Sequence, residues 1–239
     1  MFVRRSIVDR CSSALLAFAL AVATPFSVFA AQPTKKAKEA KDSAPVLMSR
    51  TGGGDSWADL AELQQAAKKG NPKAETQLGE MLLRGDSIEK DEARGIALIE
   101  KAARAGQSPA AFRIGMLLMN GESGVAKDPE RALAYFRAAA AGGEAEAFFN
   151  IGAAYASARG VKRDYAEALG WLMLARQHGA AAQAEQSLRT QLKSQPAVIA
   201  AGERRAKEIE QQFTGKKVID FLPPAAPLQQ SVAAIPASR

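Results

Sequence analysis

Apolar side chains recur every fourth residue in three stretches of the chain, a spacing that places them on one face of a helix rather than along a strand. The stretches are residues 74–85, 110–121 and 147–158. Their apolar positions are Ala74, Leu78 and Leu82; Ala110, Ile114 and Leu118; and Ala147, Ile151 and Tyr155. The pattern predicts three amphipathic helices.

Each of these predicted helices contains a glycine at the same register, at Gly79, Gly115 and Gly152. A glycine inside a helix costs about 1 kcal/mol relative to alanine. Three such glycines at one register indicate a packing requirement, and we expect a partner helix to approach closely at each of them.

A second helical segment follows each of the first ones and begins at an aspartate, at Asp91, Asp128 and Asp164. An aspartate in this place accepts hydrogen bonds from the free N–H groups of the first helical turn. A glycine closes each second segment, as is usual where a helix ends in a left-handed residue. The large residue seven positions after each aspartate is expected to point at the glycine-bearing helix. The closing glycines are Gly106, Gly143 and Gly179, and the large residues are Leu98, Tyr135 and Trp171.

The closing glycines, together with Gly70, are 36, 37 and 36 residues apart. A fixed period of this size indicates stacked repeats. Each repeat consists of two antiparallel helices, so the predicted fold is all-α, a solenoid of αα-hairpins. The additional residue of the second repeat lies in the turn between Gly121 and Asp128, where a change of length is tolerated.

This pattern resembles the Sel1-like repeat family, whose members are related to tetratricopeptide-repeat proteins. The third repeat matches the family motif at Ala147, Ile151, Gly152, Tyr155, Gly160, Val161, Asp164, Ala168, Trp171 and Gly179. The first repeat departs from the motif at Leu82, Gly95 and Leu98. The resemblance implies a right-handed superhelix, a scaffold that binds proteins, and repeats at about 74–106, 110–143 and 147–179.

Flanking segments are expected to cover the two ends of the solenoid, because its end faces are otherwise exposed. A lone helix at 55–70, with Trp57, is predicted at one end, and two helices within 183–213 at the other. The solenoid thus spans residues 55–213. Residues 214–239 form a proline-rich tail, part of which is expected to fold back onto the last helix. The residues expected in that contact are Phe213, Val218, Ile219, Phe221 and Leu222.

The first thirty residues have the features of a secretory signal peptide. A basic start precedes an apolar run, and the small residues before Ala31 suit cleavage there. An uncleaved membrane anchor is the alternative, because residues 11–30 carry no charge and approach the length that spans a bilayer. We expect a periplasmic or secreted protein. Residues 31–54, which are rich in Lys, Ala and Gly, are predicted to form a flexible linker.

The composition provides few of the side chains that commonly act in catalysis. Cys11 is the only cysteine, and it lies within the predicted signal peptide, which excludes disulfides and cysteine-based sites from the mature chain. His178 is the only histidine, and the dipole of a helix end favours a histidine at that place. We therefore predict no catalytic residue, no cofactor and no metal, and a protein that is not an enzyme.

The net charge of +7 belongs to the ends of the chain. Residues 55–213 contain 21 basic and 21 acidic residues. A nucleic-acid-binding body would carry a basic face, so nucleic acid is not an expected partner. The basic linker leaves a second hypothesis open, weak attachment to an anionic cell wall or membrane surface. The lysines that would form this attachment are Lys35, Lys36, Lys38 and Lys41.

The remaining candidate is the concave face that stacked helical pairs create, lined by the first helix of each pair. We expect a monomer that binds a protein or peptide through this face. Methionine suits adaptable binding surfaces, whereas the phenylalanines could equally pack between repeats. The candidate residues are Thr76, Glu80, Phe112, Met116, Met119, Phe149 and Asn150, with Leu83, Asn120 and Ala153 beside them.

Overall fold

The computed structural model describes residues 57, 59–225 and 228. The predicted signal peptide, its cleavage before Ala31 and the basic linker lie outside the described residues, as does most of the proline-rich tail. They therefore remain predictions.

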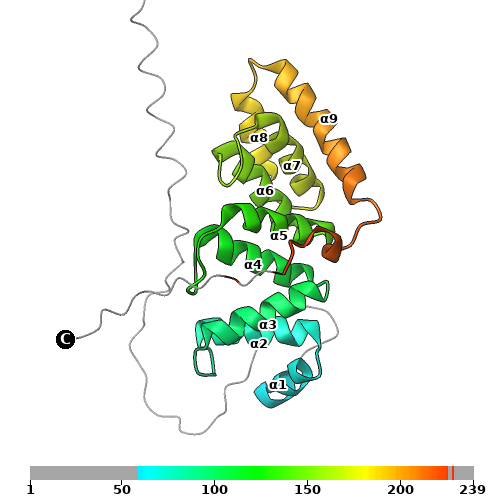
Figure 1. The fold of residues 1–239 in the computed structure, drawn as a ribbon. Helices are drawn as coiled ribbons and strands as arrows, with labels where there is room; N and C mark the ends of the chain where they lie inside the picture. Colours follow the sequence, from blue (N-terminus) through cyan, green and yellow to red (C-terminus); the bar gives the residue numbers. More distant parts are fainter. Residues whose placement is uncertain (1–56, 58, 226–227, 229–239) are drawn as a thin grey trace, which may run out of the picture. The chain divides into compact units, whose positions relative to one another are not determined.

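The described part of the chain consists of nine α-helices and one 3-10 helix, and it contains no strand (Figure 1). The helices are joined by short turns, as expected for antiparallel neighbours. Their bounds are α1 Leu60–Lys68, α2 Pro72–Arg84, α3 Glu92–Arg104, α4 Ser108–Asn120, α5 Pro129–Ala141, α6 Ala145–Ser157, α7 Tyr165–Gln177, α8 Ala182–Gln191, α9 Pro196–Phe213 and η1 Val218–Phe221.

Aspartates cap the second helix of every repeat, as predicted. The Asp91 carboxylate accepts the Arg94 N–H at 3.0 Å, and Asp128 accepts the Arg131 N–H at the same distance. Asp164 accepts from two amides, those of Ala166 and Glu167. Each cap satisfies donors that a helix start leaves free.

The predicted start of the first flanking helix at position 55 is wrong. Helix α1 begins at Leu60, because Asp59 is its cap and accepts the Glu62 N–H at 2.8 Å. Two aspartates lie four residues apart here, and the nearer one to the helix is the cap. Trp57 packs against the apolar cluster of α1 and α2, as expected for a residue that covers this end.

The closing glycines end the second helices in the left-handed region, with φ of +94° at Gly106, +88° at Gly143 and +95° at Gly179. This confirms the predicted helix ends. A residue with a Cβ atom would be strained in this conformation, which explains why glycine occurs at each of these turns.

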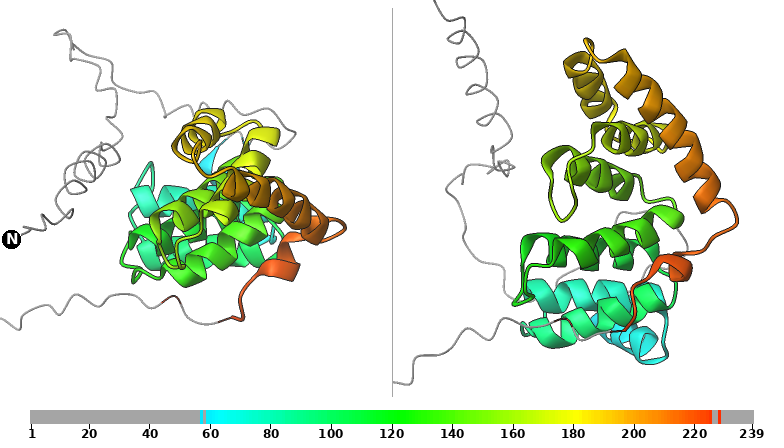
Figure 2. Two further views of the ribbon diagram at one scale, coloured as in Figure 1. Left: turned by 90° about the horizontal axis from the view of Figure 1, so that it is seen from above. Right: turned by 45° about the horizontal axis from the view of Figure 1, so that its top comes forward.

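The helical pairs α2–α3, α4–α5 and α6–α7 pack closely, and they stack in chain order through α3–α4 and α5–α6 (Figures 1 and 2). The glycines inside the first helices create the close approach, as predicted. A Cβ atom added at Gly152 would lie 3.1 Å from the Ala168 carbonyl oxygen of α7.

The side chains that cover the glycines are not the predicted ones. Ile99, Phe136 and Leu172 contact Gly79, Gly115 and Gly152, each one position beyond the large residue expected there. One residue turns the side chain by about 100° around a helix. The predicted residues Leu98 and Trp171 still pack towards the glycine-bearing helix of their own repeat, as expected, because Leu98 contacts the apolar cluster of α1 and α2 and Trp171 contacts Phe148 of α6. Tyr135 is directed at the preceding repeat instead.

The neighbours of these three residues lie in adjoining helices. Tyr135 is fully buried, and its hydroxyl is 3.1 Å from Glu100 of the preceding repeat. Trp171 packs against Phe148 and Phe213, with ring centroids 6.0 and 5.8 Å away. Leu98 packs against the apolar cluster of α1 and α2.

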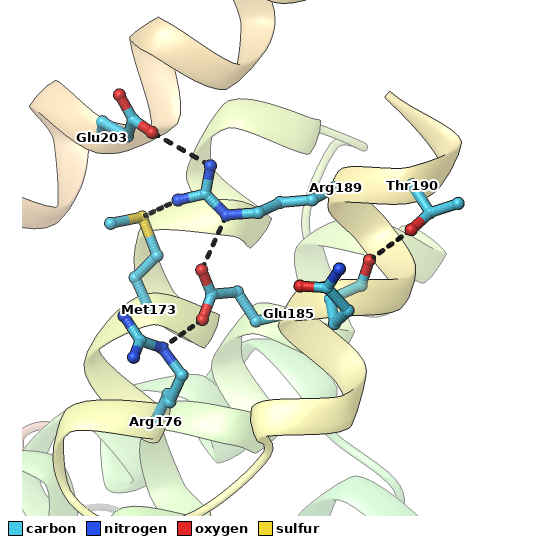
Figure 3. Close-up of polar contacts among 7 residues, drawn as sticks. Met173, Arg176, Glu185, Arg189, Thr190 and Glu203 are labelled. Atoms are coloured by element: carbon cyan, nitrogen blue, oxygen red, sulfur yellow. Dashed lines mark hydrogen bonds and ion pairs between the residues drawn. The ribbon is translucent and has the colours of Figure 1, made fainter. Parts of the chain in front are cut away.

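Helices α8 and α9 close the other end, as predicted. Helix α9 lies along α7, where Gly170 and Gly202 permit close contact, since a Cβ atom at Gly170 would be 3.3 Å from the Gly202 carbonyl oxygen. Buried Glu185 of α8 bonds to Arg176 and to Arg189 (Figure 3). Through Arg176, this carboxylate connects α8 to the end of α7.

The described part of the tail at residues 214–225 folds back, but only in part onto the last helix. The Phe221 ring stacks on Phe213 of α9 at 4.6 Å. The 3-10 helix η1 contacts α5 and α3 instead, and Val218 is buried there. The apolar side chains of the tail thus reach past the last helix to the first two repeats.

Candidate partner-binding surface

The first helices α2, α4 and α6 place equivalent residues in rows that run across the three repeats. We define the first-helix face by three rows, set by their distance from the central glycine of each helix. The rows are Thr76, Phe112 and Phe149; Gln77, Arg113 and Asn150; and Glu80, Met116 and Ala153. None of the side chains in these rows belongs to the fully packed core.

In the first row, only the residue of the third repeat is exposed. Thr76 is half-buried, and its hydroxyl donates to the Pro72 carbonyl at 2.8 Å. Phe112 is half-buried, with its ring 5.6 Å from Phe136. The Phe149 side chain is 37% exposed, and it is one of three large apolar residues that the described part exposes. Phe112 thus packs against the second helix of its own repeat, whereas Phe149 has a free surface.

Ion pairs connect the first two repeats on this face. The Arg113 Nε atom lies 2.8 Å from Glu80 Oε1, and Glu80 also pairs with Arg84 of its own helix at 3.2 Å. Arg113 reaches Glu122 at 3.5 Å as well. Because Glu80 and Arg113 belong to consecutive first helices, the pair bridges two repeats, as an ion pair only, since the Arg113 Nε–H has no hydrogen-bond partner among the described residues.

Arg113 was not among the residues predicted for this face, although Asn150, at the equivalent register 37 residues later, was. Register alone would have found it. Asn150 itself donates to the Glu146 carbonyl at 2.8 Å, which satisfies its amide within the same helix.

Met119 does not belong to the surface. It is only 4% exposed and lies in the main core cluster, so its assignment to the binding face is wrong. Leu83, the equivalent residue of the first repeat, is also buried, and it packs against Gly95 of α3. The partner helix comes close enough at this register to cover the side chain. Met116 remains half-buried at the edge of the same cluster.

Two hollows of the surface lie elsewhere. The first, of about 310 Å³, is formed mainly by residues 126–131 and Gly160. The second, of about 240 Å³, lies between α7 and α9, where Arg205 pairs with Glu167 and Glu208. The predicted surface residues line neither hollow. In the second hollow, the charges of Arg205, Glu167 and Glu208 are already paired.

Other side chains that could carry chemistry have structural roles. Burial and, to a lesser extent, the nearby Glu100 carboxylate raise the pKa of Tyr135 to about 12. The His178 ring stacks on Phe148 at a centroid distance of 4.6 Å. Within the residues described, no group of three or more His, Cys, Asp or Glu side chains could hold a metal ion. None of the described helices has the length and apolar character needed to cross a membrane.

Comparison with known proteins agrees with the repeat boundaries. The family model of the Sel1 repeat matches residues 72–107, 108–144 and 145–179, in the register predicted from the glycines. A search of curated proteins found none that matches the chain.

Two solved structures are similar to this one. A Sel1 repeat protein from Oxalobacter formigenes matches with 27% identity and a TM-score of 0.51, over 64% of this chain and 62% of that one. The protein c5321, a protective antigen present in uropathogenic Escherichia coli strains and displaying an SLR fold, matches with 28% identity and a TM-score of 0.53. The match covers 66% of this chain and 34% of that one. The chain thus spans less than two thirds of either protein.

Proposed function

The chain is a Sel1-like repeat protein, and we propose on this basis that it is a non-enzymatic scaffold of the bacterial cell envelope that binds a protein partner through its first-helix face. Sel1-repeat proteins generally mediate protein–protein interaction, and their repeats form a non-catalytic scaffold. The assignment to the envelope rests on the predicted signal peptide at residues 1–30.

The exposure of Phe149 carries the proposal for the binding face. An aromatic side chain with a free surface is the kind of residue that anchors protein interfaces. The half-buried side chains of Phe112 and Met116 lie on the same face of the preceding repeat. Together they offer an apolar centre that spans two repeats.

The charged residues beside this centre support the same proposal. Protein interfaces combine an apolar core with a polar rim. The Glu80–Arg113 pair supplies such a rim, and both of its side chains are only partly exposed, at 23% and 27%. Because the pair bridges two repeats, a partner would meet a preorganised surface, which lowers the entropy cost of binding.

Site-specific photo-crosslinking tests the proposed face. A photoreactive amino acid replaces Phe149 in the full-length protein, and cross-linked partners from the envelope fraction are identified by mass spectrometry. Tyr165 of α7 is a matched control, because it is aromatic and equally exposed at 37% but lies outside the first-helix face. We expect a specific protein adduct from position 149 alone. Adducts that form equally from both positions, or from position 165 only, would contradict the proposed face.

Amino-terminal sequencing tests the envelope assignment separately. The exported protein is expected to begin at Ala31. An intact Met1 on a membrane-bound chain would establish the anchor instead of a cleaved signal.

A further inference from the structure

Residues 214–225, which follow α9, return to the repeats. We call residues 218–223 the C-terminal strap. It lies beside α5 and reaches the end of α3, two helices that precede it by more than seventy residues (Figure 1). The strap crosses the edge at which the second helix of one repeat turns into the first helix of the next. This edge is distinct from the first-helix face.

Small residues form the seat of the strap. Position 142 carries no side chain, and a Cβ atom added there would be 3.1 Å from Val218 Cγ2. The Ile219 Cγ2 atom lies 4.0 Å from the place that a Cβ atom added at Gly106 would occupy. Ser108 lies against Gly142, and its hydroxyl donates to Glu144 at 2.8 Å. The turn at Gly142 thus leaves space that Val218 fills, since Val218 is only 6% exposed, and Ile219 lies over the turn at Gly106.

The strap makes two further kinds of contact. Its Phe221 ring stacks on Phe213 with an interplanar angle of 13°. The Pro223 carbonyl accepts a hydrogen bond of 3.4 Å from Arg104 of α3. An apolar pocket, an aromatic platform and a donor to a backbone carbonyl are the elements with which proteins bind short peptides.

The strap also keeps its own shape. The Lys217 N–H donates to the Asp220 carboxylate at 2.8 Å, and the Asp220 N–H donates to the Lys217 carbonyl at 3.0 Å. Ile219 remains 52% exposed. In the described part of the chain, the bond from Arg104 is the strap's one hydrogen bond to the repeats. The strap therefore occupies its seat mainly through side chains, as a bound peptide does.

We propose that this seat is a peptide-binding site which the strap occupies in the resting protein, and that a protein partner displaces the strap with a segment of the same chemistry. Such a segment has an aliphatic residue, an aromatic residue three positions later and a proline soon after. A tethered segment acts at an effective concentration in the millimolar range. The strap therefore restricts the site to partners that bind tightly enough to compete.

A labelled peptide tests this proposal in the full-length protein. The probe is a fluorescent synthetic peptide with the sequence of residues 216–229, and binding is followed by anisotropy. The double variant Val218→Asp, Phe221→Ser weakens the strap without changing the seat. We expect the peptide to bind this variant at least ten-fold more tightly than it binds the wild type, because the tethered competitor is weakened. The control peptide carries the same two changes and is expected to bind neither protein.

Two results would overturn the proposal. One is equal binding of the probe to the wild type and the double variant, including no binding to either. The other is loss of the helical circular dichroism in the double variant, which would make the strap an integral part of the fold rather than an exchangeable occupant. A variant that keeps its helical spectrum and gains affinity for the probe supports the proposal.

Discussion

Gly115 of α4 lies directly against the ring of Phe136 of α5, and a Cβ atom added at position 115 would be 2.6 Å from Phe136 Cε1. Atoms cannot approach so closely without displacement of a helix or of the ring. We expect Gly115→Leu to lower the free energy of unfolding by about 1–3 kcal/mol, the usual cost of overpacking. The measurement is thermal unfolding, with Lys207→Ala, an exposed change on α9, as the control. Equal melting temperatures of Gly115→Leu and the wild type would contradict this helix register.

The glycine period predicted the helical pairs because glycine has two distinct functions in this fold. At Gly106 it supplies a positive φ, and at Gly115 it permits close helix packing. Both functions leave a mark in the sequence at a fixed spacing. The side chain that fills the space beside Gly115 leaves no such mark, because Tyr135 and Phe136 are both large and aromatic. Their orientation depends on the rotation of α5, which the neighbouring repeats determine.

The candidate surface could be predicted in part for the same reason. Helical periodicity placed Phe149 and Glu80 away from the apolar stripe of the first helices, and neither side chain is buried in the structure. It could not separate Met116 from Met119, because the boundary between core and surface depends on how closely α5 approaches α4. The returning strap was beyond prediction in detail, since its contacts with α3 and α5 bridge more than seventy residues of sequence.

The two methionines give a direct test of that boundary. Met119→Glu places a carboxylate in the core and should destabilise the protein by about 3–5 kcal/mol, as an uncompensated buried charge does. Met116→Glu adds the same charge at a half-buried position and should cost about 1 kcal/mol. Chemical denaturation of both variants measures the difference. Equal stabilities would mean that Met119 is not a core residue.

The closing helices depend on Glu185, which is 5% exposed and bonds to two arginines (Figure 3). Hydrogen bonds to charged groups contribute about 1.5–3 kcal/mol. Glu185→Ala should destabilise by an amount near the lower end of that range, because Arg176 is exposed enough to be solvated by water. Gln186→Ala, at the exposed neighbouring position, is the control for helix propensity. Coinciding denaturation curves for the two variants would show that the bonds from Glu185 to Arg176 and Arg189 do not stabilise the protein.

Tyr135 makes stability depend on alkaline pH. Its pKa is about 12 in the folded chain, against an ordinary value of 10.0. The unfolded state therefore releases the phenolic proton first, so the contribution of Tyr135 is complete below pH 10 and is lost as the pH rises towards 12. The full difference corresponds to roughly 3 kcal/mol. Between pH 9 and pH 11.5 the wild type should lose more stability than Tyr135→Phe in urea denaturation. Parallel losses would contradict a raised pKa.

The last prediction distinguishes the binding face from attachment through the basic linker. Phe149→Asp places a charge on the exposed aromatic of the first-helix face and should abolish capture of the partner while the helical circular dichroism persists. Tyr165→Asp has the same starting exposure of 37% outside that face and should leave capture unchanged. Apolar contacts resist salt, whereas attraction between exposed charges is screened within about 8 Å at physiological ionic strength.

The linker supplies the opposing test. Replacement of Lys35, Lys36, Lys38 and Lys41 by glutamine should leave capture of the partner intact, and raising the salt concentration should weaken it little, because residues 55–213 carry equal numbers of basic and acidic residues. If the glutamine variant loses binding while Phe149→Asp keeps it, an anionic surface of the envelope is the binding partner. Phe149 would then be an exposed residue of the scaffold without a role in binding.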